Sequence, residues 1–207
     1  MKKIIAGVLA FAIVAFNGYM FLEGAVVSAA TTTVTSSGSA SLNWDVYLDV
    51  GNEIALTCDN ANIYLGSING MTGGNLQADR DCNVKANSGW TLAIAATNSP
   101  AMITTTTPTN SFSDRSTTKS AWSNNTASSS YGFAVSSSYS SSYSFTDISI
   151  YSGFNGTNNI TIAGNTTSTV AAGVTTTIRF RAEVGATRNQ PTGRYTSHVV
   201  VTATASP

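Results

Sequence analysis

Charged residues are scarce in this chain of 207 residues. They make up 10% of the sequence, and ten Lys and Arg balance ten Asp and Glu, whereas an average soluble protein carries about 25%. Neither a basic patch nor a charged tail is present, so the composition argues against a nucleic-acid partner. Ser, Thr, Asn and Gly take the place of the charges, and such a neutral, hydroxyl-rich surface suits an extracellular protein.

Histidine is almost absent as well, since His198 is the only one. A hydrolase nucleophile needs a neighbouring base, and no G-x-S-x-G nucleophile elbow accompanies His198. The two cysteines and His198 are far apart and lack the spacing of zinc ligands. We therefore expect no catalytic residues and no enzyme.

Helical periodicity is lacking beyond the N-terminal segment, and apolar and polar residues alternate instead. Gly-rich and Asn-rich turns separate the alternating runs, which predicts an all-β sandwich or barrel. Of the two, we expect an immunoglobulin-like β-sandwich. The stretch 104–144 is more than half Ser and Thr and is predicted to be an insertion that holds strands at 131–135 and 143–151. The other predicted strands are 42–48, 54–58, 82–86, 90–96, 178–184 and 195–203, the last two forming a terminal hairpin.

The N-terminus has the three parts of a secretory signal peptide: Lys2 and Lys3, the apolar run "IIAGVLAFAIVAF", and small residues before Ala29. The domain prediction is a signal helix over 1–29, a flexible linker over 30–41 and one sandwich domain over 42–207. A retained anchor is the alternative to cleavage, because residues 4–22 are about long enough to cross a bilayer. The membrane would then be contacted only through this segment.

Cys58 and Cys82 are the only cysteines. In an exported protein an even cysteine count indicates a disulfide, which is the prediction here; two buried free thiols are the alternative. If the two residues pair across antiparallel strands, Asp59 and Asp81 come side by side. A calcium ion held by Asp59, Asp79 and Asp81 would relieve the repulsion; otherwise these carboxylates form a solvated rim, and no other cofactor is expected.

Aromatic residues are the remaining candidates for a binding site. Trp44 and Trp90 lie on faces predicted to be buried. Trp122 lies in the polar stretch "KSAWSNNTA", near Tyr131 in the sequence. Trp122 and Tyr131 are therefore the candidate ligand-binding residues, since aromatic rings stack on sugar faces, and glycans are the corresponding partners.

Two stretches resemble a family of bacterial exported surface proteins, the spore coat protein U and pilin-like group. The first is "IALTC…CNVKANSGWTLAIAA", matched by Cys58, Cys82, Asn83, Val84 and Trp90. The second is the terminal G-x-Y-x-x-x-V-x-V-T, matched by Gly193, Tyr195, Val199, Val201 and Thr202.

The resemblance implies a secreted or cell-surface protein of β-sandwich fold. We expect a non-catalytic structural or adhesive role, as a cell-surface or filament subunit that contacts other surface proteins or itself. The alternative is a carbohydrate-binding module.

Overall fold

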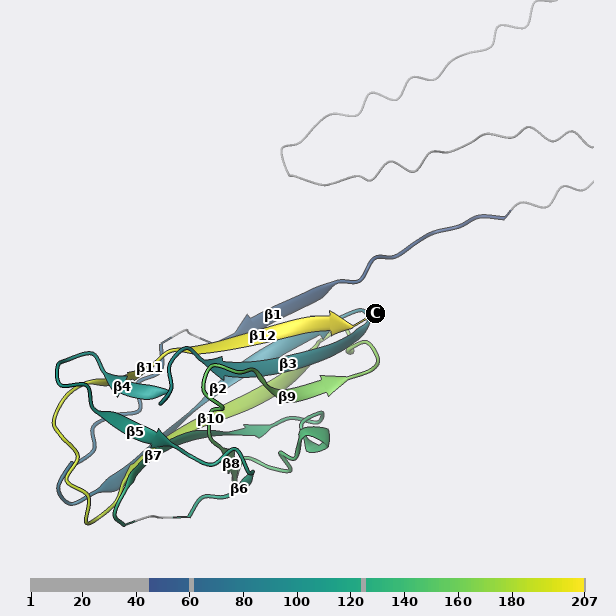
Figure 1. Cartoon of the computed structure of the whole chain (residues 1–207). Helices are drawn as coiled ribbons and strands as arrows, with labels where there is room; N and C mark the ends of the chain where they lie inside the picture. The colour runs from purple at the N-terminus through teal and green to yellow at the C-terminus, as the bar shows by residue number, and fades with distance from the viewer. Residues whose placement is uncertain (1–44, 60–61, 124–125, 207) are drawn as a thin grey trace, which may run out of the picture. The chain divides into compact units, whose positions relative to one another are not determined.

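The computed structural model describes residues 45–59, 62–123 and 126–206 (Figure 1). Asp49 begins a compact unit of β-strands, and Asp45–Leu48 are the described members of a separate unit. The predicted signal helix and linker, residues 1–29 and 30–41, lie outside the described residues. Within the part described, no helix is long and apolar enough to cross a membrane.

The larger of two sheets is mixed and strongly curled, like half of a barrel (Figure 1). Its pairs are antiparallel apart from β5 and β7, which run parallel. Two short strands, β6 (Ser120–Ala121) and β8 (Ile150–Ser152), branch from β7. The main path is β1 (Ile54–Cys58), β2 (Gly74–Ala86), β10 (Val174–Val184), β7 (Ser129–Ser136), β5 (Ser111–Asp114), β4 (Met102–Thr104) and β11 (Tyr195–Ser197).

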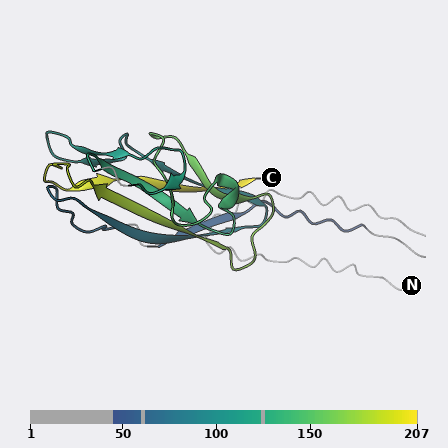
Figure 2. The same ribbon diagram turned by 90° about the horizontal axis from the view of Figure 1, so that it is seen from below.

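The smaller sheet is antiparallel and has β3 (Gly89–Ala96) between β12 (Val199–Ser206) and β9 (Ile160–Asn165). β1 and β12 belong to different sheets but lie side by side (Figure 1). Figure 2 shows the fold from below, with the end of β12 and the short 3-10 helix η1 (Ser141–Tyr143) at the same end of the fold. The loops beside β4 and β11 lie at the opposite end.

Side chains from both sheets share one hydrophobic core. The predicted inward residues of 178–184 are confirmed, since every second residue from Ile178 is buried and Arg179 and Arg181 are partly exposed. Glu183, predicted to lie outward with the two arginines, is however only 6% exposed. Trp90 is buried as predicted, whereas Trp44 lies outside the described residues. The most deeply buried large side chains are Trp90, Phe133, Phe145, Leu92, Ile94, Ile162 and Ile178.

The predicted terminal hairpin is wrong. β10 has β2 on one edge and β7 on the other, so neither edge is left for the end of the chain. The run that begins at Tyr195 divides instead at His198, whose carbonyl oxygen accepts a hydrogen bond from the N–H of Thr97. β11 pairs with β4 and β12 pairs with β3, so this one run contributes to both sheets.

Of the strand predicted over 42–48, the structure describes residues 45–48, and these do not form a strand. Asp45–Glu53 forms neither helix nor strand, because no segment among the described residues pairs with it. The Asn87 side chain holds the last three of these residues, accepting from the N–H of Glu53 at 2.7 Å and donating to the carbonyl of Gly51 at 2.8 Å. β1 starts directly afterwards at Ile54.

The Ser/Thr-rich stretch contributes more than loops. The predicted strand at 131–135 is present as the centre of β7, but only the end of the predicted strand at 143–151 is present, as β8. Buried hydroxyl groups in this region have partners within the chain: Ser140 Oγ donates to the carbonyls of Ser137 and Phe145. Such bonds let small polar side chains enter the interior at little cost.

Candidate functional site: an open apolar groove

A groove of about 1730 Å³ with an apolar floor opens in the described part of the chain. Its floor is the inner face of β10, and its two walls are residues 62–71, which follow β1, and residues 195–201 of β11 and β12. Small-molecule pockets measure about 300–1,000 Å³, so this groove is large enough for a segment of polypeptide. The floor side chains are those of Ile178, Phe180, Ala182 and Val184, all 1–4% exposed.

The walls of the groove expose large apolar side chains. Tyr64 and Met71 are each 76% exposed, and Val200 is 50% exposed on the opposite wall. Val199 and Val201 point toward the core but are only half-buried, unlike the floor beneath them. Exposed apolar side chains gathered around one opening are typical of an interaction site.

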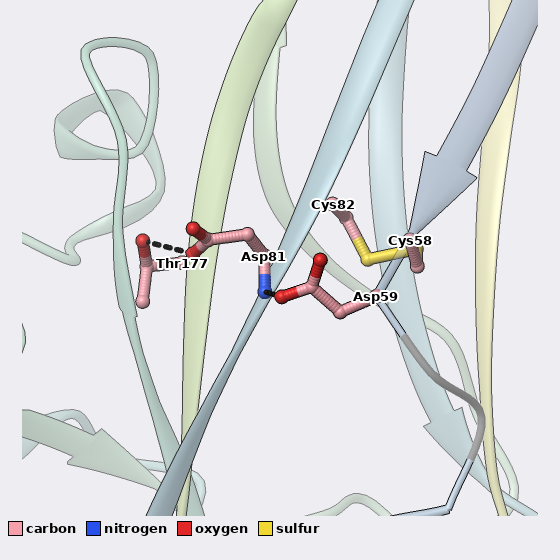
Figure 3. The surroundings of a disulfide bond; sticks show 5 residues. All are labelled: Cys58, Asp59, Asp81, Cys82 and Thr177. Atoms are coloured by element: carbon pink, nitrogen blue, oxygen red, sulfur yellow. Dashed lines mark hydrogen bonds between the residues drawn. A yellow bond between two sulfur atoms is a disulfide. The ribbon is translucent and has the colours of Figure 1, made fainter.

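One end of the groove is fixed by the disulfide between Cys58 and Cys82, and the predicted pairing is thus confirmed. The two residues are directly opposite in the β1–β2 ladder (Figure 3). Cys82 is buried on the sheet face that supports the groove, whereas Cys58 is exposed. The bond therefore attaches the end of β1, and the wall that follows it, to the core.

The other end is fixed by Gln190, which is 6% exposed. Its backbone N–H donates to the carbonyl of Gly70 on one wall, and its side-chain Nε2 donates to the Tyr195 hydroxyl on the other. The Ser129 hydroxyl donates to Gln190 Oε1 at 2.6 Å, which ties the same side chain to β7. A Cβ atom at Gly70 would lie 2.4 Å from the Gln190 carbonyl oxygen, so only glycine permits this approach.

Three strands beside the groove have a free edge. In the described chain, β1 pairs only with β2, β11 only with β4, and β12 only with β3. No Lys, Arg, Asp or Glu occurs from Tyr195 to Ser206, although such charges usually protect an edge strand from further pairing. The outer edge of β9 differs, because the N–H of Gly164 donates to the carbonyl of Tyr139.

The three predicted calcium ligands lie near one another in the β-ladder but each has a partner within the chain. Asp59 accepts from the N–H of Asp81, and Asp81 accepts from the Thr177 hydroxyl (Figure 3). Asp79 forms a two-point ion pair with Arg179 at 2.7 Å, which holds the pKa of the Asp79 carboxyl below its usual value. Among the described residues, no three His, Cys, Asp or Glu side chains are placed to hold a metal ion.

The two predicted ligand-binding aromatics lie in different surroundings. Trp122 is on the outer face of the larger sheet, where the guanidinium groups of Arg115 and Arg181 lie 4.9 and 4.7 Å from its ring centre. Its indole N–H donates to the Glu183 carboxylate at 2.5 Å. Tyr131 is 3% exposed, stacks on Phe154 in the core, and has a raised pKa because burial disfavours the phenolate.

Reasoning from the sequence missed the groove and Gln190. The stretch "GSINGMTGG" predicts a cluster of turns, and only the structure places it along the groove opposite β12. Gln190 lies 61 residues from Ser129, and Trp122 lies 61 residues from Glu183, so no local pattern links these partners. His198, which the alternation along 195–203 predicts to lie within a strand, instead lies exposed between β11 and β12.

No protein-family model, curated protein or solved structure matches this chain. The resemblance to the spore coat protein U and pilin-like group therefore stays a prediction.

Breaking the disulfide is expected to lower the free energy of unfolding. The bond closes a loop with a sequence separation of 24, for which the chain-entropy model gives about 3 kcal/mol. Urea unfolding with and without reductant measures the difference. A Cys58→Ser, Cys82→Ala double variant is the control, since reductant should not affect it; an unchanged wild-type midpoint under reduction would contradict the expectation.

Trp122→Ala is expected to destabilise the fold by about 2–3 kcal/mol, because it removes a half-buried ring and a hydrogen bond to a buried carboxylate. Trp122→Phe keeps the ring between the guanidinium groups and loses only the indole donor, so it should cost about 1 kcal/mol. Chemical unfolding of both variants gives the two values, and equal losses would argue against a role for the ring contacts.

Proposed function

We propose that this protein is an exported, non-catalytic structural or adhesive subunit of a cell surface or filament, and that it assembles through free strand edges. The observation that carries the proposal is the uncharged edge of β11 and β12, which has no strand partner among the described residues and lies beside a groove with an apolar floor. Edge strands of this kind pair readily with another chain, because their backbone donors and acceptors lack partners.

The proposal includes an immunoglobulin-like sandwich architecture for the unit, with the Ser/Thr-rich stretch 104–144 as an insertion. Two sheets that share one core support it. The curling of the larger sheet and the change of sheet at His198 support a variant of that architecture, in which one strand run contributes to both layers.

Export is supported by two independent features. The disulfide between Cys58 and Cys82 is stable in an oxidising compartment and uncommon in the cytosol. The N-terminal run has the charge and hydropathy order of a secretory signal. A secreted or cell-surface location accounts for both.

Carbohydrate binding is the less favoured function. Trp122 already has two guanidinium groups over its ring and an edge contact with Tyr151, and Tyr131 is buried. Stacking on a sugar requires an open ring face, so these contacts favour the subunit over a glycan-binding module.

Native-size analysis of the protein recovered from the medium or the cell surface tests the subunit function. We expect a ladder of assemblies rather than a single monomer peak, and Trp122→Ala should leave that ladder unchanged because Trp122 lies away from the groove. A clean monomer that binds glycans, and loses them in Trp122→Ala, would replace the subunit with the carbohydrate-binding module.

A further inference from the structure

Two loops meet at the end of the fold that lies away from the end of β12 (Figure 1). The first, residues 62–73, leads into β2, and the second, residues 185–194, follows β10. The Gln190 N–H joins them through its hydrogen bond to the Gly70 carbonyl at 2.8 Å. A Cβ atom at Gly73 would lie 3.0 Å from backbone atoms of the second loop, so the two backbones are also in contact there. We call the exposed residues of these two loops the end surface.

The first loop divides its apolar side chains between the core and the solvent. Leu65 and Ile68 pack against the core, whereas Tyr64 and Met71 are each 76% exposed. Met71 lies in a turn ordered by Asn69, whose side-chain oxygen accepts two backbone hydrogen bonds, one of them from the Met71 N–H at 2.9 Å. Met71 is therefore exposed on a turn whose backbone is held by hydrogen bonds.

The second loop adds positive charge without a negative partner. Arg188 and Arg194 are exposed, and in the described part of the chain neither forms an ion pair. No Asp or Glu occurs in residues 62–78 or 185–206. The end surface thus combines two exposed apolar side chains with two guanidinium groups that no carboxylate neutralises.

The opposite end of the fold has a different character. Val170 is 66% exposed there, in the loop that precedes β10. A Cβ atom at Gly173 of the same loop would lie 2.8 Å from the Lys85 side chain, and Glu53 is exposed directly before β1. An exposed apolar residue at this end therefore lies among charges of both signs, which makes it suitable for comparison.

The four side chains of the end surface match the chemistry of an anionic lipid bilayer. Guanidinium groups bind phosphate oxygens at two points, and basic residues near a membrane surface are attracted to its anionic lipids. Apolar side chains of a peripheral protein enter the boundary between head groups and acyl chains, where Tyr is enriched. An acidic polysaccharide would satisfy the two arginines but would leave Met71 in water, so a lipid surface fits the set better.

We propose that the end surface is a docking site for an anionic lipid bilayer. Tyr64 and Met71 enter the interface, and Arg188 and Arg194 contact the phosphate groups. Docking of this kind is peripheral and needs no helix that crosses the membrane. The inference goes beyond the proposed function, because a single molecule can dock in this way whether or not it assembles with others.

The role of the arginines is tested by co-sedimentation of the exported protein with phosphatidylcholine vesicles that contain or lack phosphatidylglycerol. We expect the partition coefficient to be at least about tenfold higher with phosphatidylglycerol, and to fall as salt screens the charges. Arg188→Gln with Arg194→Gln should abolish this preference. Lys85→Gln removes an exposed cation from the opposite end and should keep it, so equal loss in both variants would contradict the docking site.

The role of the apolar side chains is tested by Met71→Ser on the same phosphatidylglycerol vesicles. We expect the partition coefficient to fall about tenfold, because the side chain no longer gains from leaving water. Val170→Ser is the matched control and should bind like the wild type. Both side chains are exposed, so both variants should keep the circular dichroism of the wild type.

The remaining outcomes identify what else could bind. Vesicle binding that every variant retains would come from another part of the chain, such as the apolar N-terminal run, and would overturn the inference. Loss of binding to an acidic polysaccharide in the double arginine variant, with no effect of Met71→Ser on vesicles, would replace the bilayer with a glycan. A wild type that assembles but does not bind vesicles overturns the docking site alone, whereas a monomer that binds them overturns the subunit function alone.

Discussion

The whole fold depends on the backbone pairing of β10. This strand of 11 residues hydrogen-bonds with β2 along its length and with β7 from Thr177 to Val184. Buried backbone N–H and C=O groups need hydrogen-bond partners. Because β10 has a strand on both edges, its backbone can lie in the interior and its inward side chains can form part of the core. β2 brings Cys82 to this platform and β7 brings Phe133, so the disulfide and the aromatic core are both positioned by the same strand.

Pairing is complete at the centre and incomplete at β12. Leu92 and Ile94 on β3, and Ile162 on β9, are fully buried, but the inward residues of β12 are only half-buried. β12 and β1 lie side by side without joining their sheets. Solvent exposure therefore rises toward the place where β12 and β1 lie side by side. There the inward side chains are partly exposed and, among the described residues, the strand edges have no partner. Partly exposed apolar side chains and unpaired strand edges thus occur together here, and this combination distinguishes the groove from an ordinary surface depression.

The alternation of apolar residues and the cysteine count predicted those features of the fold that depend on neighbouring residues in the sequence. The all-β class, the inward face of residues 178–184, the buried Trp90 and the Cys58–Cys82 bond follow from alternation and from cysteine count. Strand partners do not, because the partner of Tyr195–Ser206 is decided by which edges β2 and β7 have already occupied. The site was missed for the same reason: Gln190 and Trp122 contact residues 61 positions away, and nothing in the neighbouring sequence marks those contacts.

The side chains that the sequence predicts as calcium or ligand-binding residues have hydrogen-bond or ion-pair partners within the chain. Asp79 has Arg179, Asp81 has Thr177, and the Trp122 indole has Glu183. The groove is of another kind, because its floor is made of apolar side chains and the strand edges beside it offer backbone amides, which no motif search detects. Backbone pairing provides affinity without regard to sequence, and pockets for alternate side chains provide selectivity. A protein with few charges and one histidine can therefore still recognise a partner, provided that the partner arrives as an extended strand with apolar residues at every second position.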